Sequence, residues 1–226
     1  MTDCHGYFIT GTDTGVGKTA VTLGLMQVMQ ARGCRVAAMK PVASGGESTA
    51  AGLRNNDALL LQQQASVALE YRQLNPYCFA PSIAPHIAAE QAGVRIDITK
   101  ICNEYNKIKG VSDCVLVEGA GGWLVPLNAE ETLAELAHSL QLEVILVVAM
   151  RLGCLNHALL TAESIVREGC VLSGWVANRV LPDMEALDEN IQALETRLAC
   201  PRLGTIPYQQ DISAKFMADH LSLPDC

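Results

Sequence analysis

The segment from Tyr7 to Ala20, which reads YFITGTDTGVGKTA, constrains this chain more than any other. A short apolar run leads into a turn rich in Gly and Thr, and an apolar-periodic segment follows Gly17-Lys18-Thr19. This order predicts a strand, a loop and a helix, in which the backbone N–H groups of the loop and of the helix start form a cradle for an anion. In such a loop Lys18 reaches the outer phosphates of a nucleotide, and the Thr19 hydroxyl faces a Mg²⁺ ion.

The spacing of this segment departs from the common phosphate-loop motif by one residue. That motif has four residues between its first Gly and the Gly-Lys-Thr triplet, whereas five residues separate Gly11 from Gly17. An ordinary Gly-rich turn between a strand and a helix is therefore the alternative. The flanking strand and helix patterns favour the phosphate loop, because the motif requires both.

Several further apolar, β-branched runs alternate with helical patterns along the chain. The predicted strands are Tyr7–Thr10, Arg35–Met39, Cys114–Val117, Val144–Ala149, Gly174–Ala177 and Leu203–Ile206. The predicted helices are Lys18–Ala31, Ala58–Ala68, Thr132–Leu140, Asn156–Arg167 and Met184–Leu198, and Asn75–Pro85 is predicted as a Pro-rich turn region. The alternation predicts an α/β fold of the P-loop NTPase type, with a doubly wound, mostly parallel sheet and helices on both faces. With no linker visible, residues 1–226 are predicted to form a single domain.

Charge and cysteine usage exclude several classes of function. The chain has a net charge of −8 and no cluster of Lys and Arg, which argues against a nucleic-acid surface. No apolar stretch is long enough to span a bilayer, and the start of the chain lacks the pattern of a signal peptide. Nine scattered Cys without a Cys-x-x-Cys pair predict reduced thiols, no zinc site and a cytoplasmic location.

Three charged residues are candidates for the ligand edge of the sheet, where parallel strands end. Lys40 follows a predicted strand directly, and a ligand contact and a solvated strand end are equally good interpretations. Glu118 ends another strand before Gly-Ala-Gly-Gly, which favours a metal-binding carboxylate beside the phosphate loop. Asp57 by pattern alone is an N-cap for the helix that follows.

Two further segments leave alternatives open. Asn156 and His157 open a predicted helix after Gly153, so Asn156 is either an N-cap or part of a site for an anionic substrate group, and His157 is either structural or a general base. Asn178 ends a strand, where its amide either contacts an adenine edge or caps a turn.

Eight sequence blocks in order carry a resemblance to a known family. They are GTDTGVGKT, KPVASGG, GLRNNDAL, NPYCFAPSIAPH, VEGAGGW, GCLNHALLT, GWVAN and GTIP. Together they closely resemble the dethiobiotin synthetases of the biotin pathway, and the resemblance runs from Gly11 to about Pro207. The longer spacing of the phosphate loop is itself the form found in that family.

The resemblance implies an ATP-dependent carboligase that acts on 7,8-diaminopelargonic acid (a diamino fatty acid) and CO₂ or bicarbonate, with Mg²⁺ as cofactor. One amine takes up CO₂ as a carbamate, the γ-phosphate of ATP converts the carbamate to a carbamic-phosphoric anhydride, and the second amine closes the ureido ring of dethiobiotin. ADP and phosphate are released. The resemblance also implies a homodimer with shared active sites.

Site residues are carried over from the family by position. The resemblance implies catalysis by Lys18 and Lys40, and metal binding by Thr19, Asp57 and Glu118. The implied ATP contacts are Gly15, Val16, Gly17, Lys18, Thr19, Ala20, Asp57, Glu118, Gly119, Ala120, Gly121, Asn178, Pro207 and Tyr208. The implied substrate contacts are Ser44 and, from the partner subunit, Gly153, Cys154, Leu155 and Asn156. The segment from Gln209 to Cys226 matches no pattern that can be carried over, and its candidate acidic contact is Asp211.

Proteins with other functions also carry a phosphate loop. A cobyrinic acid amide synthase would need a glutamine amidotransferase domain, for which 226 residues leave no room. An ATP-driven partitioning switch would carry an extra Lys early in the loop, but positions 12–16 read TDTGV. A GTP-binding switch would carry an Asn-Lys-x-Asp guanine motif, which is not present. A paralogous carboligase acting on a related diamine stays open.

Overall fold

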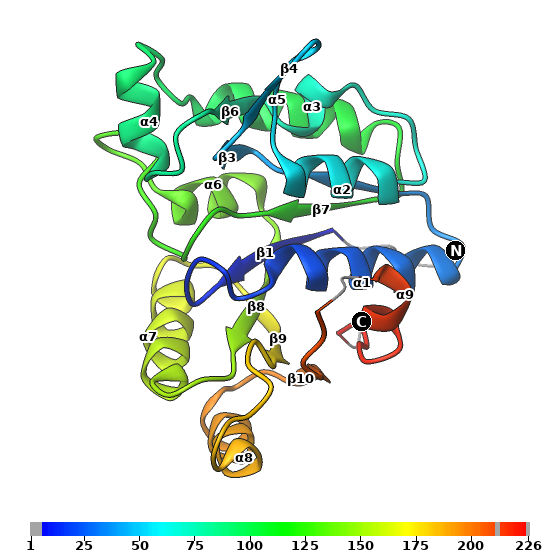
Figure 1. Ribbon diagram of the computed structural model, residues 1–226, viewed down its shortest axis with the longest axis vertical. Helices are drawn as coiled ribbons and strands as arrows, with labels where there is room; N and C mark the ends of the chain where they lie inside the picture. The colour runs from blue at the N-terminus through cyan, green and yellow to red at the C-terminus, as the bar shows by residue number, and fades with distance from the viewer. Residues whose placement is uncertain (1–5, 211–212, 225–226) are drawn as a thin grey trace.

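The computed structural model describes residues 6–210 and 213–224. Its centre is a six-stranded parallel sheet with the order β10-β9-β8-β1-β7-β2 (Figure 1). The strands are β1 (Tyr7–Gly11), β2 (Val36–Met39), β7 (Cys114–Glu118), β8 (Glu143–Ala149), β9 (Leu172–Asn178) and β10 (Arg202–Ile206). All six predicted strands are confirmed within one or two residues at each end.

Alternate residues of these strands pack against helices on opposite faces, as a doubly wound sheet requires. Ile9 in β1 packs in a cluster with α1 (Lys18–Ala31), α2 (Asn56–Gln64), α3 (Tyr71–Leu74) and α9 (Ala214–Ala218). Phe8, its neighbour in the same strand, packs in a second cluster with α4 (Pro85–Gln91), α5 (Ile98–Lys109) and α6 (Leu133–Leu140). A third cluster joins β8 and β9 to α7 (Cys154–Arg167) and α8 (Leu187–Arg197). The predicted α/β fold is confirmed.

The interval between β2 and β7 holds most of the elements that the sequence did not predict. β3 (Val42–Ser44) pairs in parallel with β6 (Tyr77–Phe79), and β4 (Glu47–Thr49) forms a hairpin with β5 (Gly52–Arg54). These pairs lie on the side of the molecule away from β10, together with α3 and α4 (Figure 1). The predicted turn region Asn75–Pro85 therefore contains one short strand.

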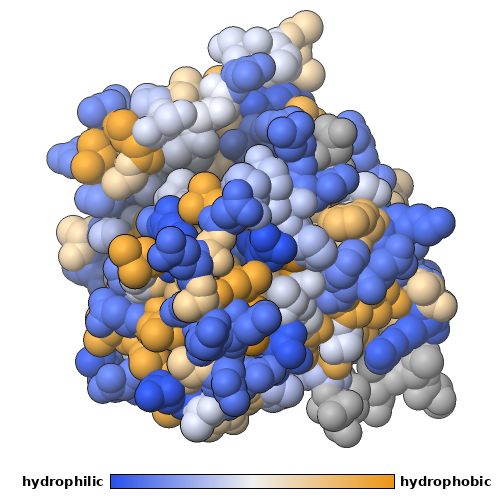
Figure 2. All heavy atoms as spheres, turned by 60° about the horizontal axis from the view of Figure 1, so that its bottom comes forward, coloured by the Kyte–Doolittle hydropathy of each residue, from blue (hydrophilic) through white to orange (hydrophobic). Residues whose placement is uncertain are grey.

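The surface is mixed in character. Figure 2, in which the bottom of Figure 1 comes forward, shows hydrophobic side chains in small groups between hydrophilic ones. Large exposed apolar side chains occur in and near α7; Leu152 is fully exposed, and Leu160 and Val166 are more than half exposed. None of the described helices is both long and apolar enough to cross a membrane.

Candidate active site

The phosphate loop joins β1 to α1 at the carboxyl edge of the sheet. Gly17 is the N-cap of α1 with φ 89°, a left-handed conformation that glycine adopts without cost. A Cβ atom added to Gly17 would lie 2.1 Å from the Asn178 side-chain nitrogen. That nitrogen donates a hydrogen bond to the Val16 carbonyl (2.8 Å). Asn178, at the end of β9, therefore packs against the phosphate loop, and position 17 has room only for glycine.

Lys18 is folded back over this loop. Its Nζ donates to the backbone carbonyls of Asp13 (2.9 Å) and Gly121 (2.6 Å), so it bridges the phosphate loop and the glycine-rich turn after β7. Burial, together with the nearby charge of Lys40, lowers the pKa of Lys18 to about 8. A partly desolvated cation of this kind is poised to gain a strong anionic partner.

Lys40 is buried between two carboxylates. Its Nζ lies 2.5 Å from Glu118 Oε1 and 3.0 Å from Asp57 Oδ2. Burial acts to lower the pKa of Lys40, but the two carboxylates outweigh it and the pKa is raised. Burial likewise acts to raise the pKa of Asp57, and Lys40 reverses this, so that the carboxyl titrates below its ordinary value. Lys40 is therefore a fixed, buried cation, so the interpretation as a solvated strand end is wrong, and the ligand contact stays a prediction.

Oxygen atoms suited to a divalent cation converge beside this lysine. The Thr19 hydroxyl donates to Glu118 Oε1 (2.8 Å), and Glu118 Oε2 is buried without a hydrogen-bond partner in the described structure. Asp57 lines the same cavity and interacts with Thr19. A fully buried carboxylate oxygen without a partner is costly unless a ligand completes it. Mg²⁺ prefers hydroxyl and carboxylate oxygens, so the residues present fit this ion.

These groups open into a cavity of about 770 Å³. Its polar part contains Gly15, Gly17, Lys18, Thr19, Ala20, Lys40, Ser44, Asp57, Glu118, Ala120 and Gly121. Its other wall is apolar and is formed by Ala43, Leu60, Ile83, Ala84, Pro85, Val125 and Pro126. The volume is that of a typical small-molecule site, and the lining combines charged with apolar side chains.

Several predicted contacts lie at the border of this cavity. Val16 is fully buried and does not line the cavity. The Gly119 carbonyl lies 3.4 Å from Lys40 Nζ, whereas its N–H is already bonded to the Ile9 carbonyl. The buried Ser44 hydroxyl lines the cavity and has no hydrogen-bond partner in the described structure.

Other predicted contacts do not line the cavity. Asn178 lies beneath the phosphate loop, and Pro207 and Tyr208 follow β10. Gly153, Cys154, Leu155 and Asn156 form the start of α7, which also stays outside the cavity lining. An ion pair between Arg151 and Asp13 (2.7 Å) nevertheless ties the segment before α7 to the phosphate loop, and no sequence pattern indicated this ion pair.

Three interpretations require correction. The N-cap of α2 is Asn55, not Asp57, because the Asn55 side chain accepts from the Ala58 N–H. The N-cap of α7 is Gly153, so Asn156 is a residue within the helix. Cys34 is disulfide-bonded, so the nine cysteines are not all reduced thiols. The candidate contact Asp211 lies outside the described residues.

The apolar wall and the Asn55 cap are the functional features that sequence reasoning missed. The block NPYCFAPSIAPH supplied Ile83, Ala84 and Pro85, but its apolar residues carried no chemistry that pointed to a cavity. The run Arg54-Asn55-Asn56-Asp57 offered three possible caps, and only the backbone decides which one is used.

Fold and site together define an ATP-utilising enzyme of the phosphate-loop class, with two lysines and two carboxylates at the mouth of the loop. The fold resembles the MinC:MinD cell division protein complex of Aquifex aeolicus (TM-score 0.57, 19% identity, covering 96% of this chain and 86% of that chain). It also resembles the signal recognition particle receptor FtsY of Elizabethkingia anophelis in complex with GDP (TM-score 0.51, 14% identity, covering 99% and 62%). At these identities the likeness concerns the fold alone.

Sequence comparison is more specific. A family model described as an AAA domain matches residues 5–215. The ATP-dependent dethiobiotin synthetase BioD of Pseudomonas aeruginosa strain UCBPP-PA14 is 50% identical over 218 residues, which is 96% of each chain. That of Nitrosospira multiformis is 48% identical over 96% of this chain and 95% of its own. The chain belongs to the family of ATP-dependent dethiobiotin synthetases.

Proposed function

We propose that this protein closes the ureido ring of dethiobiotin from 7,8-diaminopelargonic acid, CO₂ and MgATP. The observation that carries the proposal is the Lys40 ammonium, held between Glu118 and Asp57 at the mouth of a phosphate loop. A fixed cation at this point suits a reaction in which a carboxylate-like group receives a phosphoryl group. Family membership supports the same reaction.

Every atom in the reaction sequence is accounted for. An amine nitrogen of the substrate bonds to CO₂ and loses a proton, giving a carbamate. A carbamate oxygen attacks the γ-phosphorus of ATP, and the bond to the β-phosphate oxygen breaks to release ADP. The second amine attacks the carbamate carbon and loses a proton, the ring closes, and phosphate leaves with the carbamate oxygen that it had acquired.

The two lysines act electrostatically in this sequence. Negative charge accumulates on the transferring phosphoryl group and on the oxygens beside it, and preorganised cations stabilise it most strongly in a water-poor cavity. Lys18 lies over the phosphate loop and stabilises the negative charge on the phosphate oxygens. Lys40, held by its two carboxylates, stabilises the negative charge on the carbamate and the γ-phosphate.

The backbone of the loop and three oxygen-bearing side chains complete the nucleotide site. The N–H groups of Gly15, Val16, Gly17 and Ala20 face the phosphates. Thr19, Asp57 and Glu118 hold Mg²⁺, which neutralises phosphate charge when it is bound. Gly119, Ala120 and Gly121, in the turn after β7, form the side of the nucleotide site that faces the phosphate loop. Asn178, Pro207 and Tyr208 frame the adenine, a role supported by the contact of Asn178 with the loop.

The substrate occupies the apolar half of the cavity. Its aliphatic chain packs against residues such as Ile83 and Pro126, and the unpartnered Ser44 hydroxyl binds its reacting end. The carboxylate at the other end binds the start of α7, Gly153 to Asn156, of a partner subunit in a homodimer. Exposed N–H groups at a helix start suit an anion, and the fully exposed Leu152 beside them supports an interface there. The enzyme acts in the cytoplasm.

The test is product formation by the purified protein with the diamine, bicarbonate and MgATP. We expect dethiobiotin and ADP in equal amounts, with no ATP turnover when either the diamine or CO₂ is left out. A partitioning switch would hydrolyse ATP without the diamine, and a paralogous carboligase would require a different diamine. Either outcome would contradict the proposal.

Replacing either lysine tests the assigned roles. Lys40→Ala and Lys18→Ala should each lower kcat by about 10²-fold or more, because each removes several kcal/mol of transition-state stabilisation. The matched control is Lys215→Ala, a lysine of α9 outside the cavity lining. Circular dichroism should show an unchanged fold in all three, and near-normal activity in Lys40→Ala would remove that residue from the mechanism.

A further inference from the structure

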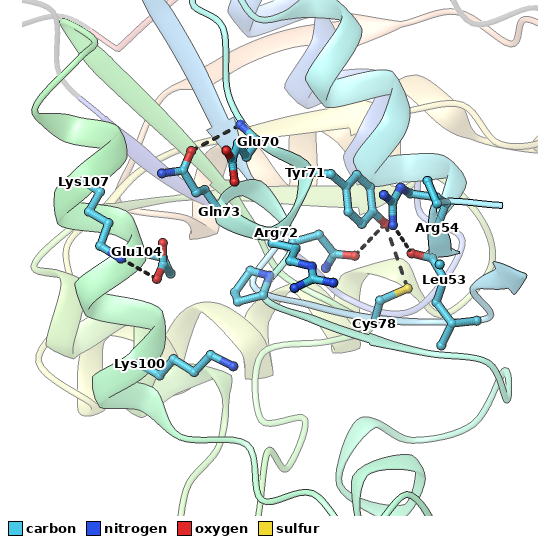
Figure 3. Close-up of a pocket in the computed structure, with 14 residues that line it drawn as sticks. Leu53, Arg54, Glu70, Tyr71, Arg72, Gln73, Cys78, Lys100, Glu104 and Lys107 are labelled. Atoms are coloured by element: carbon cyan, nitrogen blue, oxygen red, sulfur yellow. Dashed lines mark hydrogen bonds and ion pairs between the residues drawn. The ribbon is translucent and has the colours of Figure 1, made fainter. Parts of the chain in front are cut away.

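Tyr71, the first residue of α3, lies between the two segments that carry Lys40 and Asp57. Its side chain is buried and also forms part of the wall of a second cavity, of about 590 Å³, outside the active site. Figure 3 shows Arg54 beside the Tyr71 ring and Cys78 near its hydroxyl. The residue has no contact with the cavity that holds the lysines, so any effect on the reaction passes through its neighbours.

On one side, Tyr71 reaches the backbone of Lys40. Its hydroxyl donates to Asn75 Oδ1 (2.8 Å), and Asn75 Nδ2 donates in turn to the Lys40 carbonyl (2.7 Å). The Lys40 N–H donates to the Leu74 carbonyl (2.8 Å). The peptide groups on both sides of the Lys40 Cα are thus held by residues 74 and 75, and Asn75 is held in orientation by Tyr71.

On the other side, Tyr71 reaches the start of α2. The same hydroxyl accepts a hydrogen bond from the Asn55 N–H (2.7 Å). Asn55 is the N-cap of α2, and Asp57 lies in the first turn of that helix. The Arg54 guanidinium stacks on the Tyr71 ring, 4.2 Å from its centre. The hydrogen bond to Asn55 and the stacking of Arg54 therefore both hold the start of α2 against Tyr71.

The Tyr71 hydroxyl joins Asn55 to Asn75, although each of the two has a second anchor: Asn75 Nδ2 also donates to the Tyr77 carbonyl (3.0 Å), and Asn55 Nδ2 donates to the Ser44 carbonyl (3.2 Å). Asn55, Tyr71 and Asn75 are all at most 9% exposed, so a polar group left without its partner there is costly. Burial raises the pKa of Tyr71 to about 12, which keeps the hydroxyl protonated and able to donate. Loss of this one oxygen would leave an N–H and an amide oxygen buried without their partner.

We propose that Tyr71 is a positioning residue that sets the separation of Lys40 and Asp57, and through it the placement of the Lys40 ammonium. The inference rests on the proposed function, in which that ammonium stabilises the reacting carbamate. Tyr71→Phe keeps the ring and its packing and removes only the hydroxyl. Because a misplaced catalytic group lowers the rate of the chemical step, kcat should fall about tenfold, while ADP binding at the phosphate loop, measured without Mg²⁺ so that Asp57 takes no part in it, changes less than twofold.

Tyr77→Phe is the matched control. Tyr77 is similarly buried, and its hydroxyl also accepts from the N–H of a helix N-cap residue, Asp97 of α5 (3.0 Å). Both variants should lose thermal stability, because each leaves a buried N–H without its partner. Only Tyr71→Phe should lower kcat, and equal effects of the two variants on kcat would overturn the proposal.

A double-mutant cycle tests whether Tyr71 acts through Asp57. We expect Tyr71→Phe to lower kcat about tenfold in the native background and less than twofold in the Asp57→Asn background, because the interaction that it positions is already lost. Tyr77→Phe should have the same small effect in both backgrounds. Additive losses for Tyr71→Phe and Asp57→Asn would show that the hydroxyl acts elsewhere.

A readout without turnover separates this inference from the proposed function. In protein labelled with ¹⁵N-lysine, the ammonium signal that disappears in Lys40→Ala should shift in Tyr71→Phe and stay in place in Tyr77→Phe. If native protein makes no dethiobiotin, the proposed function fails while the shift still tests the positioning. An unshifted signal overturns the inference even in an active enzyme.

Discussion

Lys18 and Lys40 show how two identical residues acquire different properties from their partners. Both are buried in one cavity, but Lys40 faces two carboxylates whereas Lys18 faces backbone carbonyls. The pKa of Lys18 is consequently lowered and that of Lys40 raised. Sequence alone made Lys18 a phosphate contact and left Lys40 open between a ligand contact and a solvated strand end. The carboxylates beside Lys40 and the Gly121 carbonyl beside Lys18 come from distant segments and had no signature in the chain.

The lowered pKa of Lys18 predicts proton uptake on nucleotide binding. Free protein loses this proton near pH 8, whereas bound phosphates stabilise the ammonium, so ADP binding at pH 8.5 should take up part of a proton and at pH 7 almost none. Calorimetry in two buffers of different ionisation enthalpy measures this uptake. Lys18→Met is the control and should abolish it, and an equal uptake at pH 8.5 in that variant would refute the assignment.

The same lysine predicts a trend in stability. Between pH 8 and its ordinary value of 10.5, Lys18 is deprotonated when folded but still charged when unfolded. The unfolded state then binds more protons, so this group makes the free energy of unfolding rise with pH over that range. Urea titrations of native protein and of Lys18→Met at pH 8 and 10 isolate the contribution, and a smaller rise is expected in the variant.

At the scale of elements, long apolar runs were predictable and short paired segments were not. Each central strand is a near-continuous apolar run, because both faces of a parallel sheet are covered. β3, β4, β5 and β6 have three residues each, too few to show a period, and β3 pairs with a strand more than thirty residues away along the chain. The helix α4, whose first residue Pro85 lines the apolar wall, was also missed, because its seven residues make only about two turns.

The Asn55 cap predicts a link between helix stability and metal binding. Asn55→Ala removes the side chain that accepts from the Ala58 N–H and should cost about 1 kcal/mol of unfolding free energy. Because Asp57 lies in the same turn, Mg²⁺-dependent binding of ADP should also weaken several-fold. Thr132→Ala removes a comparable cap, on α6, and should cost similar stability without affecting the nucleotide. Equal nucleotide affinity in both variants would separate the cap from the site.

At the scale of the whole molecule, the cavity and the start of α7 are separate features of one chain. The phosphate loop, Lys40 and the carboxylates line the cavity, and Gly153 to Asn156 do not. We therefore expect a substrate that contacts both features to do so across two subunits. Neither the dimer nor the assignment of residues 1–226 to a single domain follows from the sheet alone, and both stay predictions.

Subunit mixing tests the shared site. Asn156→Asp adds a carboxylate at the start of α7, which should repel the substrate carboxylate and weaken diamine binding far more than ATP binding. Mixed with Lys40→Ala protein, it should partly restore activity, because one site of the mixed dimer combines both intact halves. No restoration despite demonstrated subunit exchange would place the whole site within one chain.

The fate of oxygen from CO₂ tests the central claim most directly. In a brief single turnover with C¹⁸O₂, the diamine and MgATP, a phosphorylated carbamate must give up one of its own oxygens when the ring closes. Mass spectrometry of the released phosphate should therefore show one ¹⁸O atom per phosphate, less any label exchanged with water. Dethiobiotin accompanied by unlabelled phosphate, from CO₂ that was still labelled, would contradict phosphoryl transfer to the carbamate.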